Sequence, residues 1–315
     1  MATTITAQDV IRPATVAESA MRRPSRSLWS DAWRQFRRHR LAMLGVVVLA
    51  LLLAMTLFGP LLYRMPSDTI DYSQGLLGPS LQHPFGTDDL GRDLLARAMI
   101  GGRVSMAVGV VAVLIAITLG TLIGAVAGYF GGRTDTALMR FTDLFLALPP
   151  LPFLLMVTYL FRDPVKKVLG PEVGTFMLIV AVIGILNWMA LSRLVRASFL
   201  SVKQKEYIEA ARCIGAGNRR IMLGHILPNT LSAVIVAATV GVGAAIITES
   251  ALSFLGVGFP PDMPTWGRLL YDAQNFLDLA PHWAIFPGLL IFLTVLSINY
   301  IGDGLRDALD PRKTQ

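Results

Sequence analysis

Two carboxylates, Glu206 and Glu209, lie in the longest polar and basic stretch in the second half of the chain, residues 203–228. This stretch reads KQKEYIEAARCIGAGNRRIMLGHILP, and long apolar segments lie on both sides of it. Acidic and basic side chains in one short segment can form ion pairs with a partner and steer its approach. The chemistry that this pattern favours is recognition of another protein.

The sequence patterns that would indicate catalysis are missing. The sequence has no G-x-x-x-x-G-K-[ST] phosphate loop, no H-E-x-x-H, no G-x-S-x-G and no paired cysteine motif. One cysteine, Cys213, forms no intrachain disulfide, and the four histidines are too far apart to show metal-ligand spacing. We therefore expect a non-catalytic chain without a cofactor, whose energy source lies on another subunit.

The composition indicates a membrane protein that crosses the bilayer several times. Hydrophobic residues make up 54% of the 315 residues and charged residues only 16%, whereas soluble domains have about 25% charged residues. The net charge of +7 is divided among clusters between apolar runs. Such clusters are typical of topology signals, and they argue against a nucleic-acid partner.

Six apolar runs predict an all-α membrane protein with six transmembrane helices. They cover residues 41–62, 104–130, 137–161, 175–200, 231–255 and 283–301. The first run has about 22 uncharged residues, enough to cross about 30 Å of hydrocarbon. Around them we predict a disordered tail (1–26), an interfacial helix (27–40), an external segment (63–103), a transmembrane core (104–302) and a short tail (303–315).

The helix predicted over residues 27–40 has an aromatic face. Trp29, Trp33 and Phe36 recur at i, i+4 and i+7. Four arginines surround them: Arg34, Arg37, Arg38 and Arg40. The pattern suits a helix that lies in the bilayer interface, and a second interpretation stays open, in which it is a basic flank that only orients the next helix.

Local patterns within the core make further predictions. Gly120, Gly124 and Gly128 line one face of the second span, where small residues let two helices approach closely. The external segment contains HPFGTDDLGRDLLARAMIGGR, in which Asp88 or Asp89 is the predicted start of a capped helix. The fourth span carries an amide at Asn187 and an indole at Trp188.

The distribution of lysine and arginine predicts the orientation of the chain. Basic residues concentrate before the first span and between the fourth and fifth spans, whereas residues 256–282 have a single arginine. Cytoplasmic loops carry the excess of basic residues. Both termini and residues 203–228 are therefore predicted to be cytoplasmic. The segments predicted to face outward are residues 63–103, 162–174 and 256–282.

Two features of the spans are candidates for a transport pathway or gate. Glu249 lies in the fifth span, about 10 Å from its outer end, where an acidic group should face the protein interior or a water path. A place on the pathway or gate and a contact that pairs helices both stay open for it. Pro149 and Pro150, with Pro152, interrupt the third span and predict either a moving hinge or a static kink.

Residues 203–228 are predicted to form a short helical hairpin. The first helix is expected from Glu206 to Ile214, with Tyr207, Ala211 and Ile214 on one face. Glycine in residues 215–217 favours a turn. Asn218 is the predicted cap of a second helix over residues 219–226, and Pro228 marks the entry to the fifth span. The hairpin is then a part that a soluble partner moves.

The hairpin also resembles the EAA signature of the permeases of ATP-binding-cassette (ABC) importers. The matching residues are Glu209, Ala210, Ala211, Gly215, Leu227 and Pro228, and the chain departs from the signature at His225, where the family usually has isoleucine. The stretches SLWSDAWRQFRRHRLAMLG, HPFGTDDLGRDLLARAMIGGRVS, ITESALSFLGVGFPPDMPTWGRLL and INYIGDGLRDALDPR resemble the C-type permease of dipeptide, oligopeptide and nickel importers. The resemblance covers most of the chain.

The resemblance implies a type I permease fold in the bacterial inner membrane and an assembly with other subunits. The partners it implies are a homologous B-type permease in a heterodimer, two cytoplasmic ATPase subunits that bind ATP and Mg²⁺, and a periplasmic substrate-binding protein. It implies that the hairpin is the coupling helix that contacts one ATPase. The residues proposed for this contact are Glu206, Glu209, Ala210, Ala211, Arg212, Gly215, Ala216, Arg219 and Arg220.

The transported load implied by the resemblance is short peptides, with nickel, glutathione or another small solute as alternatives. A self-contained secondary transporter is a different possibility. It would need ligand-binding broken helices, often in repeated halves, and the sequence has no convincing repeat. A membrane-embedded enzyme would need paired catalytic residues in the spans, and none are visible.

Overall fold

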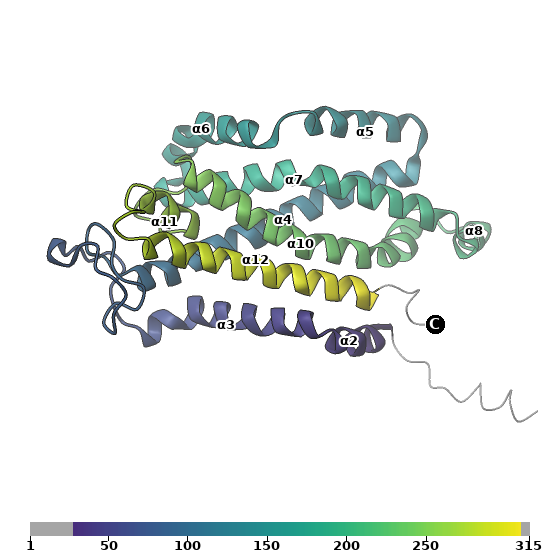
Figure 1. The fold of residues 1–315 in the computed structure, drawn as a ribbon. Helices are drawn as coiled ribbons and strands as arrows, with labels where there is room; N and C mark the ends of the chain where they lie inside the picture. Colours follow the sequence, from purple (N-terminus) through teal and green to yellow (C-terminus); the bar gives the residue numbers. More distant parts are fainter. Residues whose placement is uncertain (1–27, 310–315) are drawn as a thin grey trace, which may run out of the picture.

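The computed structural model describes residues 28–309, which are almost entirely helical (Figure 1). The predicted tail over residues 1–26 and the end of the C-terminal tail, residues 310–315, lie outside the described part. Within it, the all-α membrane fold predicted from the sequence is confirmed. The main helices are α2 (Leu28–Arg38), α3 (Arg40–Leu62), α4 (Leu94–Phe130), α5 (Gly132–Leu146), α6 (Pro150–Leu169), α7 (Pro171–Lys203), α8 (Glu206–Cys213), α10 (Leu227–Phe254), α11 (Trp266–Ala273) and α12 (His282–Leu309).

Short elements complete the described chain. A 3₁₀ turn, η1, covers Tyr72–Gln74 in the external segment. A single helical turn, α9 (Asn218–Arg220), and a π-helical segment, Ile221–Ile226, lead directly into α10. Together these three elements form one helix, Asn218–Phe254, that is long and apolar enough to cross a membrane.

Five continuous helices in the described residues meet the length and apolarity of a membrane span, namely α3, α4, α7, α12 and the helix Asn218–Phe254. The predicted third span, residues 137–161, is not one helix. It is divided into α5 and α6, which meet at an angle of 86°. Pro149 precedes α6 and Pro150 is its first residue. Proline has no N–H to continue a helix, and it disfavours helical backbone in the residue before it, so the prolines break the span instead of kinking it.

The predicted external loop over residues 162–174 is also absent from the described structure. Helix α6 continues to Leu169, and α7 begins at Pro171, so that Gly170 alone connects them. Its φ of +82° is a conformation that glycine adopts without the strain of a side chain. The charged residues of this region, which suggested a loop, lie in the exposed last turns of α6.

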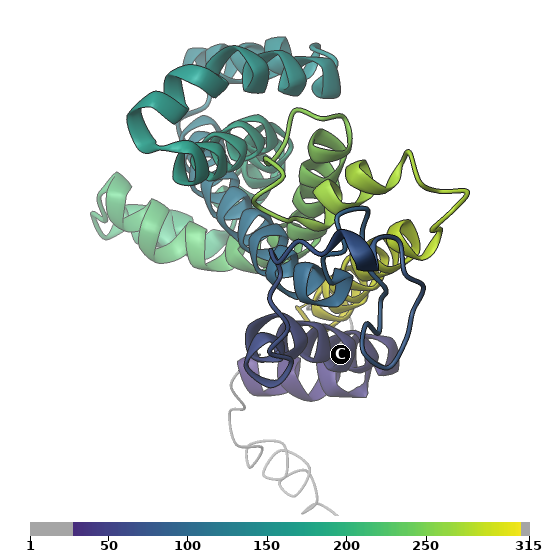
Figure 2. The same cartoon turned by 90° about the vertical axis from the view of Figure 1, so that its left-hand side faces the viewer.

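The elements gather at two ends of the bundle (Figure 1). The hairpin helix α8, helix α2 and the end of α12 lie at one end, and α11 lies with the segment before α4 at the other. Figure 2 looks along the bundle from the second end and shows α5 and α6 standing apart from the helices α3 and α12. The bundle therefore has the two-ended layout that the basic residues predict, although no membrane is present to assign the sides.

Helices α4 and α7 approach each other closely along the predicted glycine face. A Cβ atom at Gly120 would lie 2.8 Å from the carbonyl oxygen of Trp188, and one at Gly128 would lie 2.7 Å from Cβ of Phe199. Gly124 lies against the backbone of Ser192 in the same way. These distances leave no room for a side chain, so the prediction of a packing face is confirmed.

Helix α4 begins later than predicted. Its N-terminal cap is Asp93, whose Oδ1 accepts a hydrogen bond from the backbone N–H of Ala96 at 2.7 Å. Asp88 was one predicted cap, but its buried carboxylate accepts from the N–H groups of Leu90 and Arg92 and so closes a turn before the helix. The local pattern does not distinguish these aspartates, because the carboxylates of Asp88 and Asp93 both accept backbone N–H groups two to four residues further along the chain.

A cluster of polar side chains fastens the external segment to the start of α4. Oδ2 of Asp93 accepts from the hydroxyl of Tyr63 at 2.7 Å and lies 2.7 Å from Nδ1 of His83. Nε2 of His83 lies 3.0 Å from the side-chain oxygen of Gln74. Burial raises the pKa of Tyr63 well above its ordinary value, and the hydrogen bond to Asp93 raises it further. The phenol therefore stays a donor at all physiological pH values.

Helix α2 exists where the sequence predicts a helix, and it packs on the end of α12. Phe36 is buried, and a Cβ atom at Gly304 would lie 3.1 Å from its ring. The side-chain amide of Gln35 donates to the backbone oxygen of Asp307 at 2.8 Å. Trp33 is exposed. Phe36 thus faces the protein rather than lipid, and a position of α2 in the bilayer interface stays a prediction.

We predict that Gly124→Ala lowers the stability of the protein, because the added methyl group overlaps the backbone of α7. Overpacking of this kind costs roughly 1–3 kcal/mol. The matched control is Gly224→Ala, where a Cβ atom meets nothing within 4 Å. Thermal unfolding in detergent, followed by loss of the monodisperse peak in size-exclusion chromatography, should show a lower midpoint for the first variant alone. Equal midpoints would contradict the close contact between α4 and α7.

Candidate functional site

The predicted hairpin is present, and its first helix is α8. The helix ends in a Schellman motif, in which the N–H of Gly215 donates to the oxygen of Arg212 at 2.9 Å. The N–H of Ala216 donates to the oxygen of Ala211 at 3.0 Å. Gly215 has a φ of +84°, so the prediction that a glycine ends this helix is confirmed.

Helix α8 is buried on the side of Ile208 and Ala211. Ile208 and Ala211 are 0% and 6% exposed, whereas Tyr207 and Ile214 are 47% and 86% exposed. Only Ala211 of the predicted face therefore packs inward. The i, i+4, i+7 pattern groups residues on one face but does not say which face is covered, and the surface that α8 packs against decides that.

The second arm of the hairpin begins at Asn218, but Asn218 does not cap it. The N-cap is Gly217, and the side-chain oxygen of Asn218 accepts a hydrogen bond from the hydroxyl of Tyr129 at 2.8 Å. The predicted cap is therefore wrong, because a tertiary partner at the end of α4 takes the side chain. The arm also does not stop at residue 226, since it continues into α10.

The π-helical segment explains how Pro228 fits into this continuous helix. Proline has no N–H, and its ring clashes with the carbonyl group four residues earlier. Just before it, the N–H of Leu227 donates to the oxygen of Met222, five residues back. The wider register accommodates the proline without ending the helix. Single π turns of this kind are frequent at functional positions.

The hairpin is fastened to the ends of α4 and α7. The ammonium group of Lys203 donates to the oxygen of Tyr129 at 2.5 Å and lies 5.5 Å from the centre of its ring. Ile208 and Ile221 are buried in one cluster with Phe199 and Val195 of α7. An apolar cluster and polar contacts therefore join the hairpin to the bundle as one packed unit.

The surface of the hairpin carries most of the residues predicted for coupling. Seven of them are exposed: Glu206, Glu209, Ala210, Arg212, Gly215, Arg219 and Arg220. Ala216 is half-buried, and Ala211 is buried. The exposed side chains Tyr207 and Ile214 were missed as surface residues, and they add apolar area to this charged surface. The surface can offer ion pairs around an apolar centre, as protein interfaces do.

Glu249 is fully buried at a junction of three helices. Its Oε2 accepts from the hydroxyl of Ser105 in α4 at 3.1 Å, and its Oε1 accepts from Ser253 in α10 at 2.8 Å. The same Ser105 hydroxyl oxygen accepts the backbone N–H of Trp266 in α11 at 3.2 Å. The carboxyl group thus joins helices. Pro149 and Pro150, the other candidates for a gate, lie exposed at the break between α5 and α6 and belong to a different part of the fold.

Two ion pairs join α5, the helix before the proline break, to α7. Arg196 makes two hydrogen bonds of 2.5 Å to the carboxylate of Asp135. Arg193 pairs with Asp143 at 2.5 Å, and both side chains are about half exposed. Exposed pairs contribute little stability, roughly 0–1 kcal/mol each. The Arg193–Asp143 pair therefore orients α5 more than it anchors it, whereas the Arg196–Asp135 pair is less exposed, at 34% and 16%.

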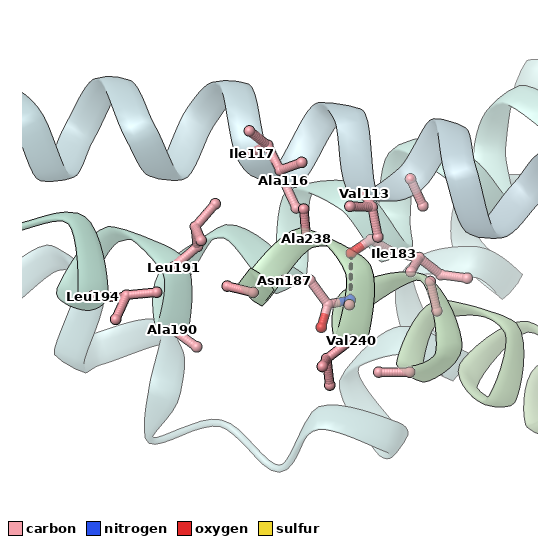
Figure 3. Close-up of a pocket in the computed structure, with 15 residues that line it drawn as sticks. Val113, Ala116, Ile117, Ile183, Asn187, Ala190, Leu191, Leu194, Ala238 and Val240 are labelled. Atoms are coloured by element: carbon pink, nitrogen blue, oxygen red, sulfur yellow. Dashed lines mark hydrogen bonds between the residues drawn. The ribbon is translucent and has the colours of Figure 1, made fainter. Parts of the chain in front are cut away.

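A pocket of about 360 Å³ lies between α4, α7 and α10 (Figure 3). Its walls are small and branched apolar side chains, and Asn187 is the only polar residue among the described residues that line it. The sequence shows Asn187 as a lone amide at the middle of a span, but the pattern gives no sign of the neighbours that make a pocket around it. No group of three or more His, Cys, Asp or Glu suited to a metal occurs in the described residues.

Two protein families together match most of the chain. The family described as binding-protein-dependent transport system inner membrane component matches residues 120–315. The family described as the N-terminal TM domain of oligopeptide transport permease C matches residues 27–82.

Curated relatives resemble the chain over nearly its whole length. It is 40% identical to the dipeptide transport system permease protein DppC of Alkalihalophilus pseudofirmus, over 91% of this chain and 90% of that protein. It is 40% identical to the oligopeptide permease OppC of Haemophilus influenzae, over 93% and 91%. It is 42% identical to the glutathione permease GsiD of Escherichia coli, over 91% of each chain.

A solved structure shares the fold. A chain of the MetNI methionine ABC transporter, in an inward facing conformation, matches with a TM-score of 0.55 and 16% identity. The match covers 69% of this chain and 96% of the other. At this identity the likeness concerns the fold alone, and it confirms the expected permease architecture.

We predict that Glu249→Ala destabilises the protein by roughly 1–3 kcal/mol, because it leaves the buried hydroxyls of Ser105 and Ser253 without their acceptor. Glu249→Gln keeps one acceptor oxygen and should lose less. Glu209→Ala, a change at an exposed carboxylate, is the control and should stay within about 0.5 kcal/mol. Thermal unfolding midpoints measure the order. If Glu249→Ala unfolds with the wild-type midpoint, the carboxyl group does not join the helices.

Proposed function

The chain belongs to the family of binding-protein-dependent transport inner membrane components, the permeases of ABC importers, and we propose that its load is short peptides. The observation that carries the proposal is about 40% identity, over nine-tenths of the chain, to permeases named for dipeptides, oligopeptides and glutathione. Glutathione is itself a tripeptide, so the three names share one chemical class. Nickel or another small solute is the alternative load.

The hairpin is the proposed contact with an ATPase subunit. The support is its chemistry and its place in the fold: carboxylates and arginines surround exposed Tyr207 and Ile214 at one end of the bundle. Such a surface can bind a groove of a soluble partner through a small apolar centre and a charged rim. Because Ile208 is buried against the bundle, a displacement of the hairpin also displaces the helices behind it.

The direct route for that displacement is the helix Asn218–Phe254. It begins in the hairpin, passes along the pocket and reaches Glu249 near its far end. A push on the hairpin therefore acts on the axis of a helix that crosses the whole bundle. Alternating access by rocking of packed helices needs such a stiff connection. For Glu249 we propose a helix-joining role, and for Pro149 and Pro150 a break that separates α5 from α6.

The remaining partners follow from the family. We infer two cytoplasmic ATPases that hold ATP and Mg²⁺, a homologous B-type permease and a periplasmic substrate-binding protein, with no cofactor in this chain. The inferred location is the bacterial inner membrane, with both termini and the hairpin in the cytoplasm. The support is that α2, α8 and the end of α12 lie at one end of the bundle, together with most of the basic residues.

We predict that Glu209→Lys reduces peptide uptake at least tenfold while the amount of protein in the membrane stays normal, because the side chain is exposed on the hairpin. Glu172→Lys is the matched control, since Glu172 is an exposed carboxylate at the other end of α7. Uptake of radiolabelled dialanine by whole cells is the measurement.

A strain without this chain sets the baseline of that assay. If its dialanine uptake equals that of the wild type, the peptide load is wrong. If uptake depends on the chain but Glu209→Lys transports normally, the load stands and the coupling role of the hairpin is wrong.

We also predict that Cys213 is labelled from the cytoplasmic side. It is the single cysteine of the chain and is exposed at the end of α8. A membrane-impermeant maleimide should label it in inside-out vesicles and leave it unlabelled in right-side-out vesicles. The reverse pattern would place the hairpin outside. Cys213→Ser gives the background signal.

A further inference from the structure

The pocket between α4, α7 and α10 combines an apolar wall with one exposed amide. The wall facing Asn187 is made of residues with little side-chain volume, among them Ala237, Ala238, Gly241 and Ala244 of α10. The side-chain N–H of Asn187 donates to the oxygen of Ile183 at 2.7 Å (Figure 3). Its carbonyl oxygen, an acceptor with two lone pairs, and the second N–H of the amide are the polar groups left to the pocket.

The depth of Asn187 makes its exposure informative. The residue is at the midpoint of α7, and its side chain is exposed in this single chain. Polar side chains at such a depth face a bundle interior, a partner or a water-filled cavity, because an amide against lipid chains is costly. The side of α7 that carries Asn187 and faces the pocket, called here its concave side, is therefore not a lipid-facing side. Ile185, only two residues away and 49% exposed, lines a shallow apolar groove with α4 residues such as Leu114.

We propose that this pocket is a binding site for the transported solute, in which Asn187 Oδ1 accepts a hydrogen bond from a peptide N–H. The inference rests on the proposed peptide load and assigns a specificity-determining residue to it. The apolar walls accept an uncharged side chain, and one acceptor orients the backbone beside it. A volume of about 360 Å³ falls within the range of small-ligand sites, about 300–1,000 Å³. Sites of this kind are mostly apolar with few polar groups.

The wall opposite α7 belongs to the helix that starts in the hairpin. Residues 237–245 of the pocket lie on α10, and α10 is continuous with the hairpin arm from Asn218. A movement of the hairpin thus moves one wall of the site directly. Small residues on this wall let α10 slide without displacing bulky side chains. The affinity of the pocket for a solute then depends on the position of the hairpin. A permease needs such a change in affinity to release what it has bound.

Cysteine accessibility tests the site without knowledge of the load. On a Cys213→Ser background, Asn187→Cys and Ile185→Cys are compared in the assembled importer in membrane vesicles, with a positively charged methanethiosulfonate reagent. We expect Asn187→Cys to react at least tenfold faster, because only the concave side of α7 is reached by water. Equally slow reaction at both positions overturns the proposal and shows that a helix of the paired permease, or lipid, covers the pocket.

A transport assay is the second part of the test. Asn187→Leu, which keeps the size and removes the acceptor, should raise the KM for dialanine about tenfold, the equivalent of one hydrogen bond. Asn187→Gln restores an acceptor and should stay within about threefold of the wild type, and Ile185→Leu should match the wild type. Co-purification with the partner subunits shows that each variant assembles. An assembled Asn187→Leu importer with wild-type KM overturns the role of Asn187. If the wild type takes up no dialanine, the peptide load fails, and the labelling rates still decide whether the pocket is a water-accessible site.

Discussion

The close approach of α4 and α7 is the constraint on which the rest of the bundle depends. In lipid, helices gain no hydrophobic energy from contact with each other, so packing must come from van der Waals contact at short range. Gly120, Gly124 and Gly128 make this possible because they have no Cβ atom at three positions, four residues apart, on the face that meets α7. The same contact continues at Gly184, where a Cβ atom would lie 2.8 Å from the oxygen of Ala112. It forms one side of the pocket and the base on which the hairpin rests.

The hairpin and the pocket are connected by rigid parts rather than by loops. The backbone oxygen of Tyr129, at the end of α4, accepts from Lys203 at the end of α7, and its hydroxyl donates to Asn218 in the second arm of the hairpin. One residue of the packed pair therefore contacts the chain on both sides of α8. Beyond the π turn, α10 continues as one wall of the pocket. Its far end is joined to α4 again through Glu249 and Ser105. A helix joined near both of its ends can tilt between its neighbours but cannot easily leave them.

Much of the fold and of the hairpin was predictable, because membrane-spanning helices are visible in the sequence as long apolar runs. The spans, the glycine face, the helix-ending Gly215 and the family resemblance at Glu209–Pro228 all follow from local sequence. The errors have a different origin. Asn218 resembles a helix cap but its side chain accepts a hydrogen bond from Tyr129, and Asp88 resembles a helix start but closes a turn. For Asn218 a partner distant in sequence decides among the local options, whereas for Asp88 the competing options are themselves local. The break at Pro149 and the pocket around Asn187 likewise depend on neighbouring helices that a single run does not reveal.

The buried carboxyl group of Glu249 also bears on how the protein is made. An acidic side chain in a membrane helix costs on the order of 2.5–3.5 kcal/mol at the helix centre when it has no partner. Its partner Ser105 lies in α4, which is synthesised more than a hundred residues earlier. When α10 is synthesised, the α4 hydroxyl that donates to its carboxyl group has therefore already been made. The other donor, Ser253, lies in α10 itself. The order of the helices along the chain therefore makes both donors available to the carboxyl group by the time α10 is complete.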